Sequence, residues 1–287
     1  MRRSASRLRP LILATGFLVL IVVVWEGAKF IGGDPWRLGA WEWRPPLELS
    51  FASDLKLPHV WDIIGALADP VQRGTDQSLA SFLVGAALYT WREAAIGFVV
   101  GAALGIGLAT VFVHSRLAER AFVPYVIASQ TIPIVALAPM IVFAFGPNVL
   151  SVVVIATYLT FFPVTIAMIR GLRTPDPQAL ELMRSYAASR RAIFWKLRLP
   201  ASVPYLFTAL KISATASIVG AIVGEGPGQI RDGLGRAIVN FNNQYVSGPE
   251  KLWATIVVSA VLGIVFFGVI LLAERWTLRG RAREALA

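Results

Sequence analysis

The chain has 287 residues, of which 56% are hydrophobic and only 15% are charged, and its mean hydropathy is +0.65. A soluble core of this length does not bury so much apolar surface, so the composition excludes an ordinary soluble domain and predicts an all-α, polytopic membrane protein. The formal net charge of +10 would favour nucleic-acid binding in a soluble protein, but the positions of the charges decide against it. Cysteine is absent, which excludes disulfides and thiolate metal sites.

Six apolar runs are candidates for membrane-spanning helices, each of which needs about 20 residues. They lie at residues 11–30, 82–113, 122–145, 149–169, 205–223 and 252–273. Arginines precede the first run, as in a secretory signal peptide. The run ends without an Ala-x-Ala-like cleavage site, so we expect it to be a retained anchor.

The basic residues predict the orientation of the chain. With the amino terminus in the cytoplasm, the inner segments hold four, two, seven and four of the 27 Lys and Arg residues, whereas the segment 31–81 has seven acidic and four basic residues. This is the positive-inside pattern. We therefore expect a basic amino terminus and first span at 1–30, an outer loop at 31–81, a core of five spans at 82–273 and a cytoplasmic tail at 274–287. Tryptophans of the outer loop fit either an interfacial aromatic belt or a small core within the loop.

Small residues mark one face of the second predicted span. Gly97, Gly101 and Gly105 are four residues apart, so they share a helical face that another helix can approach closely. Arg92 and Glu93 precede them near the outer start of the span. We expect these two side chains to reach water as an exposed pair.

The third predicted span contains two prolines. Pro133 and Pro139 each remove a backbone donor, and such distorted helices are tolerated in membranes where they line protein or a water-filled cavity. Amide, hydroxyl and aromatic groups near this distortion and on the fourth span are candidates for a translocation path that binds a heterocycle, although each could equally be a helix-packing residue. They are Gln130, Thr131, Tyr158, Phe161 and Phe162.

Glu225 ends the fifth predicted span and is a further candidate for the path, because an acid in this position is costly unless it is paired or hydrated. The alternative is that it pairs with Arg231 or Arg236 in the following outer loop. The glycines of that loop do not form Gly-x4-Gly-Lys-Ser/Thr, so a P-loop is excluded and energy for transport must come from a partner.

Residues 181–200 form a basic segment between the fourth and fifth predicted spans. Its apolar residues recur at roughly helical intervals, and its arginines and lysine keep it out of hydrocarbon. The apolar residues are Leu182, Tyr186, Ile193, Leu197 and Leu199. We expect a helical element whose apolar stripe meets another protein.

This segment resembles the EAA loop of ABC-importer permeases, through Glu181, the tetrad at 187–190, Ile193, Phe194 and the closing Leu199-Pro200. The family's usual Glu-Ala-Ala is Glu-Leu-Met here. The glycine that follows it in the family is Ala187, so a residue with a Cβ must make the turn. A wider resemblance, to the nitrate, taurine and sulfonate branch of these permeases, runs from about Leu57 to Ala273. It includes Ile132-Pro133, Ala138-Pro139, Phe145-Gly146, Phe162-Pro163, Gly171-Leu172 and Asp176-Pro177.

The resemblance implies a type I ABC-importer permease fold in the bacterial inner membrane. It also implies a second permease subunit, expected to be another copy of the chain, a separate ABC ATPase dimer and an extracytoplasmic solute-binding protein, with no cofactor, catalytic residue or nucleic-acid partner in this chain. The coupling loop would lie at 171–203. Its expected contacts with the ATPase are Glu181, Tyr186, Ala187, Ser189, Arg190 and Phe194.

The carboxyl-terminal third contains Gly-Leu-Gly-Arg-Ala-Ile at 233–238 and Ser-Gly-Pro-Glu-Lys-Leu-Trp at 247–253. In these segments it resembles permeases for riboflavin or vitamin pyrimidine precursors more than sulfonate permeases, with taurine, alkanesulfonates and nitrate as alternative substrates. An ion-coupled secondary transporter is another alternative. It would use intramembrane charges such as Glu26, Lys29, Glu93, Lys211 and Glu225. A membrane enzyme is disfavoured, because two isolated histidines offer little material for an active site.

Overall fold

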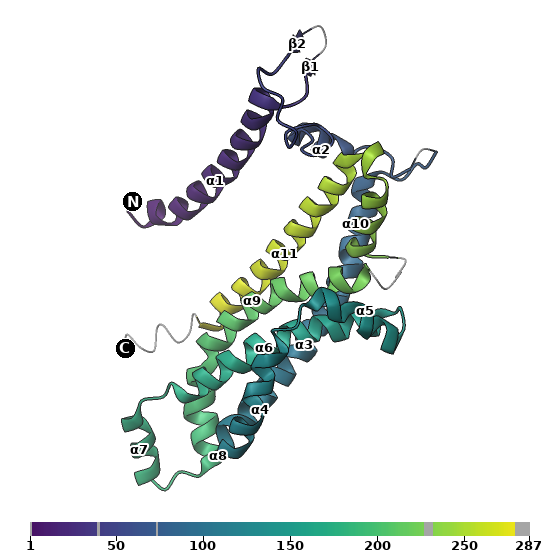
Figure 1. The fold of residues 1–287 in the computed structure, drawn as a ribbon. Helices are drawn as coiled ribbons and strands as arrows, with labels where there is room; N and C mark the ends of the chain where they lie inside the picture. Colours follow the sequence, from purple (N-terminus) through teal and green to yellow (C-terminus); the bar gives the residue numbers. More distant parts are fainter. Residues whose placement is uncertain (1, 39–40, 73, 227–231, 279–287) are drawn as a thin grey trace. The chain divides into compact units, whose positions relative to one another are not determined.

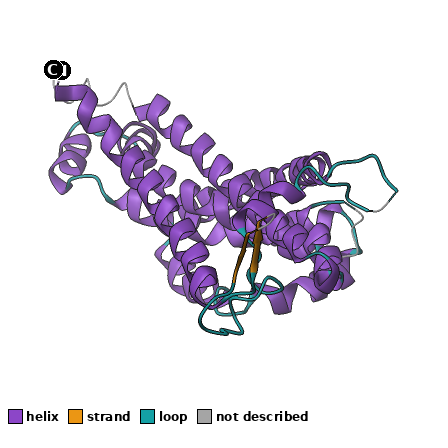
Figure 2. Cartoon of the chain, turned by 90° about the horizontal axis from the view of Figure 1, so that it is seen from above, coloured by secondary structure: helices purple, strands orange, loops and turns teal. Residues whose placement is uncertain are grey.

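The computed structural model describes residues 2–38, 41–72, 74–226 and 232–278. The chain forms two compact units, each built from two stretches of sequence. Unit 1 comprises Met1–Phe82 and Asn240–Ile256, and unit 2 comprises Leu83–Val239 and Val257–Ala287. Figure 1 gives the course of the chain, and Figure 2 shows that helices account for most of it.

Within the described residues, five helices are long and apolar enough to cross a membrane. They are α1 (Arg2–Gly32), α3 (Leu79–His114), α6 (Val149–Arg173), α9 (Leu199–Glu225), which continues the shorter α8 (Arg190–Ile193), and α11 (Pro249–Leu278). They correspond to five of the six predicted spans.

The remaining predicted span is broken. Its two parts are α4 (Arg116–Ser129) and α5 (Ile134–Phe145), whose axes bend by 100° at the intervening residues. The six-span prediction is confirmed when this bent pair counts as one span. Pro133 explains the position of the break, because proline disfavours the helical conformation of the residue before it and is itself the N-cap of α5.

Unit 1 joins the end of α1 to a folded outer segment. This segment contains an antiparallel hairpin of β1 (Trp36–Leu38) and β2 (Trp41–Trp43), in which Trp36 lies opposite Trp43, and the short helix α2 (Val60–Ala66). The ring of Trp36 meets the His59 and Trp61 rings edge-on, at centroid distances of 4.8 and 5.4 Å. This tryptophan therefore belongs to a small core within the outer segment. The 3-10 turn η2 (Tyr245–Ser247) also belongs to unit 1.

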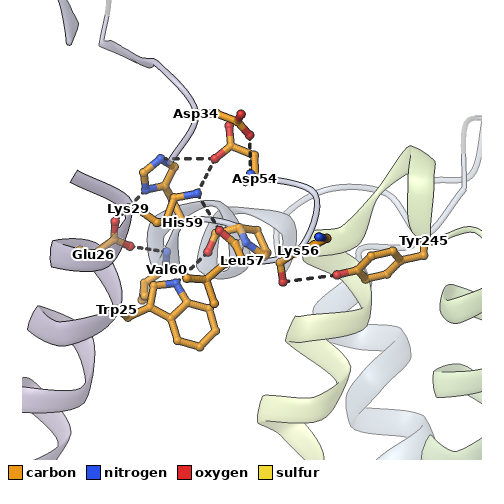
Figure 3. Close-up of polar contacts among 11 residues, drawn as sticks. Trp25, Glu26, Lys29, Asp34, Asp54, Lys56, Leu57, His59, Val60 and Tyr245 are labelled. Atoms are coloured by element: carbon orange, nitrogen blue, oxygen red, sulfur yellow. Dashed lines mark hydrogen bonds and ion pairs between the residues drawn. The ribbon is translucent and has the colours of Figure 1, made fainter. Parts of the chain in front are cut away.

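Polar contacts fix α1 to the outer segment (Figure 3). The Glu26 carboxylate accepts from the Val60 backbone N–H at 2.8 Å and lies 2.7 Å from His59 Nδ1. Lys29, although fully buried, donates to the Leu57 carbonyl oxygen at 2.6 Å and pairs with Asp54. A buried ammonium is tolerated only with such partners, so these contacts determine where α1 ends against the loop.

In unit 2, α3 packs directly against α6 through the face that the glycine pattern predicted for close helix packing. A Cβ built on Gly97, Gly101 or Gly105 would come within 2.5 to 2.8 Å of Ala156, Thr160 or Val164, so no larger residue fits at this contact. The hydroxyl of Thr157 on α6 also donates to the Gly97 carbonyl oxygen at 3.2 Å. Helix α9 lies along α6, and Lys211 of α9 pairs with Glu274 of α11 at 2.7 Å. The helix α10 (Leu234–Asn243) begins in this unit.

Candidate coupling and translocation sites

Residues 181–200 are two helices joined by a turn, rather than the single helical element that the apolar spacing suggested. The first helix, α7 (Pro177–Ser185), begins at Asp176, whose side chain accepts from the Gln178 N–H at 2.9 Å, and has proline in its first position. Both are standard N-terminal signals. Helix α7 follows α6 in sequence and projects away from both α6 and α9 (Figure 1).

Ala187 ends this helix in the left-handed conformation, with φ of +53°. The N–H of Ala187 donates to Arg184 O at 2.9 Å, and the N–H of Ala188 donates to Met183 O at 3.0 Å. These two bonds form a Schellman cap, which usually has glycine at the left-handed position. The prediction that a residue with a Cβ makes this turn is confirmed.

The second helix restarts immediately after the turn. The Ser189 hydroxyl accepts from the Ala192 N–H at 3.2 Å and caps α8. The chain then passes through a π-helical turn, η1 (Phe194–Arg198), into α9. Pro200 at the start of α9 lacks an N–H, and the wider π turn accommodates its ring. The chain is therefore helical without interruption from Arg190 to Glu225.

The expected coupling residues differ in exposure. Glu181, Ala187, Ser189 and Arg190 are exposed, and Tyr186 is 80% exposed. Phe194 is half-buried. It packs against the core cluster that α3, α6 and α9 share, and its ring centroid is 5.3 Å from that of His114. Phe194 thus fastens the segment to the helices, while the others remain available to a partner.

A groove of about 620 Å³ lies between this segment and the end of α3. Its lining is strongly basic, with His114, Arg116, Arg184, Arg190 and Arg198. The ion pair between Arg173 of α6 and Glu119 of α4, at 2.5 Å, ties the two neighbouring helix ends together. Sequence reasoning counted these basic residues as evidence of orientation but did not identify the groove, because the turn at Ala187 brings its walls together.

Apart from Glu225, the structure brings four of the five expected path residues together, at the break between α4 and α5 and on the neighbouring part of α6. Gln130 and Thr131 lie at the break between α4 and α5, and the Tyr158 hydroxyl donates to the Ser129 carbonyl oxygen beside it. The ring of Phe161 lies 5.9 Å from that of Tyr158. Phe162 follows on α6 and is half-buried. The buried Nε2 of Gln130 has no hydrogen-bond partner in the described part of the chain.

Glu225 lies with a different group of residues. It is fully buried, and its Oε2 accepts from the Gly235 N–H at 2.7 Å. Among the described residues it forms no ion pair with Arg236, and Arg231 lies outside them, so the arginine-pair interpretation has no support from Arg236. Its side-chain neighbours include the hydroxyl group of Thr90 and the carboxyl group of Glu93.

The expectation that Glu93 is an exposed partner of Arg92 is wrong, because Glu93 is fully buried. The reason is helical geometry. Glu93 is four residues before Gly97 and therefore lies on the face that packs against the rest of unit 2, whereas Arg92 points to the exposed side. The four-residue spacing of Glu93 from the glycines was the signal that could have revealed this.

The comparisons with known proteins decide the family. Residues 101–279, more than half of the chain, match the family model described as "Binding-protein-dependent transport system inner membrane component". The chain belongs to this family.

Several relatives cover much of the chain. It is 31% identical over 284 residues to the formylaminopyrimidine transport permease protein ThiX of Halalkalibacterium halodurans, which covers 99% of this chain and 100% of that protein. It is 30% identical over 169 residues to the riboflavin transport system permease protein RibX of Chloroflexus aurantiacus, covering 59% and 62% of the two chains. The aliphatic sulfonates permease protein SsuC of Bacillus subtilis is 28% identical over 66% of this chain and 67% of its own.

A solved structure of an amino acid ABC transporter also matches, with a TM-score of 0.56, 16% identity, and coverage of 68% of this chain and 94% of that chain. At this identity the match shows the fold alone, which is that of a type I importer permease. The family, the full-length relative and the spans identify the protein as a multi-pass permease subunit of an ABC importer.

Proposed function

We propose that the turn between α7 and α8 is the contact through which a separate ATPase drives this permease. The observation that carries the proposal is an exposed apolar pair on a rigidly capped turn. Leu182 is 58% exposed and Tyr186 is 80% exposed, and both lie beside the Schellman cap at Ala187. Such apolar side chains on a short helix are suited to a groove in a partner protein.

The segment can also transmit movement. Phe194 is packed into the core cluster, and α8, η1 and α9 form one helical stretch from Arg190 to Glu225. A displacement of the turn is therefore carried along α9 as a rigid element. We expect closure of the ATPase dimer to draw two such segments together and to open the outer end of the path. The basic groove beside the turn favours an acidic surface on the partner.

We infer that a second copy of the chain completes the translocation path. Helix α5 has 12 residues, which at about 1.5 Å per residue is too short for a hydrocarbon core of about 30 Å. The break at Gln130 and Thr131 leaves irregular backbone that lipid cannot satisfy, so protein or water must cover it. Another copy of the permease would provide this cover and would place Gln130, Thr131, Tyr158, Phe161 and Phe162 beside a shared path.

We propose a pyrimidine vitamin precursor as the transported solute, delivered from outside by a solute-binding protein. The support is the match with the formylaminopyrimidine permease, which extends over 99% of this chain, while the matches with the riboflavin and sulfonate permeases cover 59% and 66%. The unpartnered amide of Gln130 and the rings of Tyr158 and Phe161 fit hydrogen bonding to, and stacking on, a flat heterocycle.

Calorimetry with the purified cognate solute-binding protein tests the substrate. The panel contains formylaminopyrimidine, riboflavin, taurine, an alkanesulfonate and nitrate. We expect micromolar or tighter binding of the pyrimidine only. Selective binding of riboflavin, a sulfonate or nitrate would discard the pyrimidine proposal and leave the importer assignment standing.

Uptake by proteoliposomes that contain the permease, its ATPase and its binding protein tests the energy source. We expect uptake to stop when the ATPase is inactivated and to persist when a protonophore removes the proton gradient. The reverse result would favour the ion-coupled alternative.

A further inference from the structure

Two buried carboxyl groups meet inside unit 2, and none of the described residues forms an ion pair with either of them. Glu93 on α3 and Glu225, the last residue of α9, are both 0% exposed, and their carboxyl groups lie next to each other. Of the four carboxyl oxygens, Glu225 Oε2 accepts a hydrogen bond from the Gly235 N–H at 2.7 Å. In the described part of the chain, both oxygens of Glu93 and Oε1 of Glu225 lack a hydrogen bond of normal geometry, although the Tyr89 hydroxyl lies near Glu93 and the Thr90 hydroxyl lies near Glu225.

The charges around the pair do not balance two ionised carboxylates. The ion pairs found among the described residues involve neither Glu93 nor Glu225. Among the described residues, the other charged or titratable groups nearby are Tyr89 and Arg92 on α3 and Asp232 before α10, and the Arg92 side chain is exposed. Two carboxylates in contact in a low-dielectric interior repel strongly, and burying both without a cation costs still more.

One shared proton would reduce the repulsion between the two carboxylates and would also supply a hydrogen-bond donor. A carboxylic acid has an O–H donor that a carboxylate lacks, so a single proton removes one charge and supplies a donor to the facing oxygens. We propose that Glu93 and Glu225 bind one proton between them as an acid–carboxylate pair that joins α3 to the end of α9. This inference is independent of the ATPase contact and of the substrate.

The pair also fixes the loop that leads into α10. The Gly235 N–H donates to Glu225, and the Leu234 N–H donates to the Thr90 hydroxyl of α3 at 2.9 Å. Gly233 has φ of +108°, and a Cβ there would collide with the Glu225 carboxyl group. Residues 233–235 are therefore bound from both helices at once. Loss of the shared proton would place two negative charges together and loosen the loop from α3.

Infrared spectroscopy of the full-length protein in lipid bilayers tests the proposal directly. At neutral pH, we expect the wild type to show the C=O stretch of a protonated, buried carboxylic acid. The double variant Glu93→Gln/Glu225→Gln should lack this band and remain folded, because glutamine has the shape of the acid and also supplies a donor. The matched control, Glu250→Gln in the first turn of α11, should leave the band unchanged.

Thermal unfolding of the single variants provides a second test. Glu93→Gln should keep the wild-type midpoint, because the amide N–H replaces the acid O–H, whereas Glu93→Ala should lower it. A wild type without the carboxylic-acid band would overturn the proposal. So would a midpoint that rises on addition of Na⁺ or Ca²⁺ and loses this rise in Glu93→Gln, because a metal cation would then occupy the place of the proton.

Discussion

At the scale of single residues, Ala187 is the position at which this chain departs most clearly from ordinary backbone geometry. An alanine in the left-handed region costs about 1 to 2 kcal/mol relative to the right-handed helix. The two bonds of the Schellman cap offset this cost and hold the turn that presents Tyr186.

We predict that Ala187→Gly stabilises the turn by up to about 1 kcal/mol, because glycine adopts positive φ without strain. The measurement is amide hydrogen exchange at residues 187 and 188, whose N–H groups form the cap. The control is Ala179→Gly inside α7, where glycine should weaken the helix by a similar amount. Slower exchange in Ala179→Gly, or faster exchange in Ala187→Gly, would contradict this account of the turn.

A second prediction concerns Lys211 and Glu274, which pair at 2.7 Å with side chains only 21% and 16% exposed. Lys211→Met alone should destabilise the protein more than the double variant Lys211→Met/Glu274→Leu. The reason is that the single change leaves a buried charge without a partner. Thermal unfolding in the same detergent measures both. If the unfolding midpoint decreased equally in the two variants, the ion pair would make no specific contribution to stability.

Single residues also show what the sequence could and could not predict. Ala187 occupies the position at which the resembled permeases have glycine, and this was sufficient to predict a turn made by a residue with a Cβ. Glu93 was misassigned because its neighbour Arg92 suggested an exposed pair, although its spacing from Gly97 placed it on the packed face. The contact between Glu93 and Glu225 joins residues from two helices that are distant in sequence, and no local pattern predicts it.

At the scale of elements, the contact between α3 and α6 depends on the absence of side chains. The glycine spacing predicted the contact face but not the partner helix. The structure identifies the partner as α6, with Thr157 and Thr160 opposite Gly101.

We predict that Gly101→Ala destabilises the protein by about 1 to 3 kcal/mol, the usual cost of overpacking. The added Cβ would lie 2.6 Å from Thr160 Cβ and 2.8 Å from the Thr157 carbonyl oxygen. Gly107→Ala on the same helix is the matched control, because nothing lies within 4 Å of its added Cβ. Thermal unfolding compares the two variants. A decrease in the unfolding midpoint of Gly107→Ala as large as that of Gly101→Ala would contradict the explanation that overpacking between α3 and α6 causes the destabilisation.

Two elements differ from their predicted form for identifiable reasons. Proline indicated that the third span is distorted, but the 100° bend depends on how α4 and α5 pack, which composition does not encode. The apolar spacing at 181–200 continued across the turn, so periodicity alone suggested one element. The cap at Ala187 divides it, and the two parts present different sets of residues.

At the scale of the whole molecule, the membrane orientation is a proposal that single cysteines can test, because the chain has none of its own. Ser185 in the coupling segment and Ser247 in η2 are both exposed. In intact cells, we expect an impermeant maleimide to label Ser247→Cys and not Ser185→Cys. Labelling of Ser185→Cys alone would show that the chain has the opposite orientation in the membrane.

The central claim is that the capped turn between α7 and α8 receives the ATPase, and copurification of the ATPase with the permease from membranes tests it most directly. The variant Leu182→Asp/Tyr186→Asp changes two exposed side chains and leaves the half-buried Phe194 in place. We predict that this variant inserts and folds normally but loses the ATPase, whereas Val246→Asp, at a site 83% exposed in η2, retains it. Undiminished copurification with the Leu182→Asp/Tyr186→Asp variant would contradict the assignment.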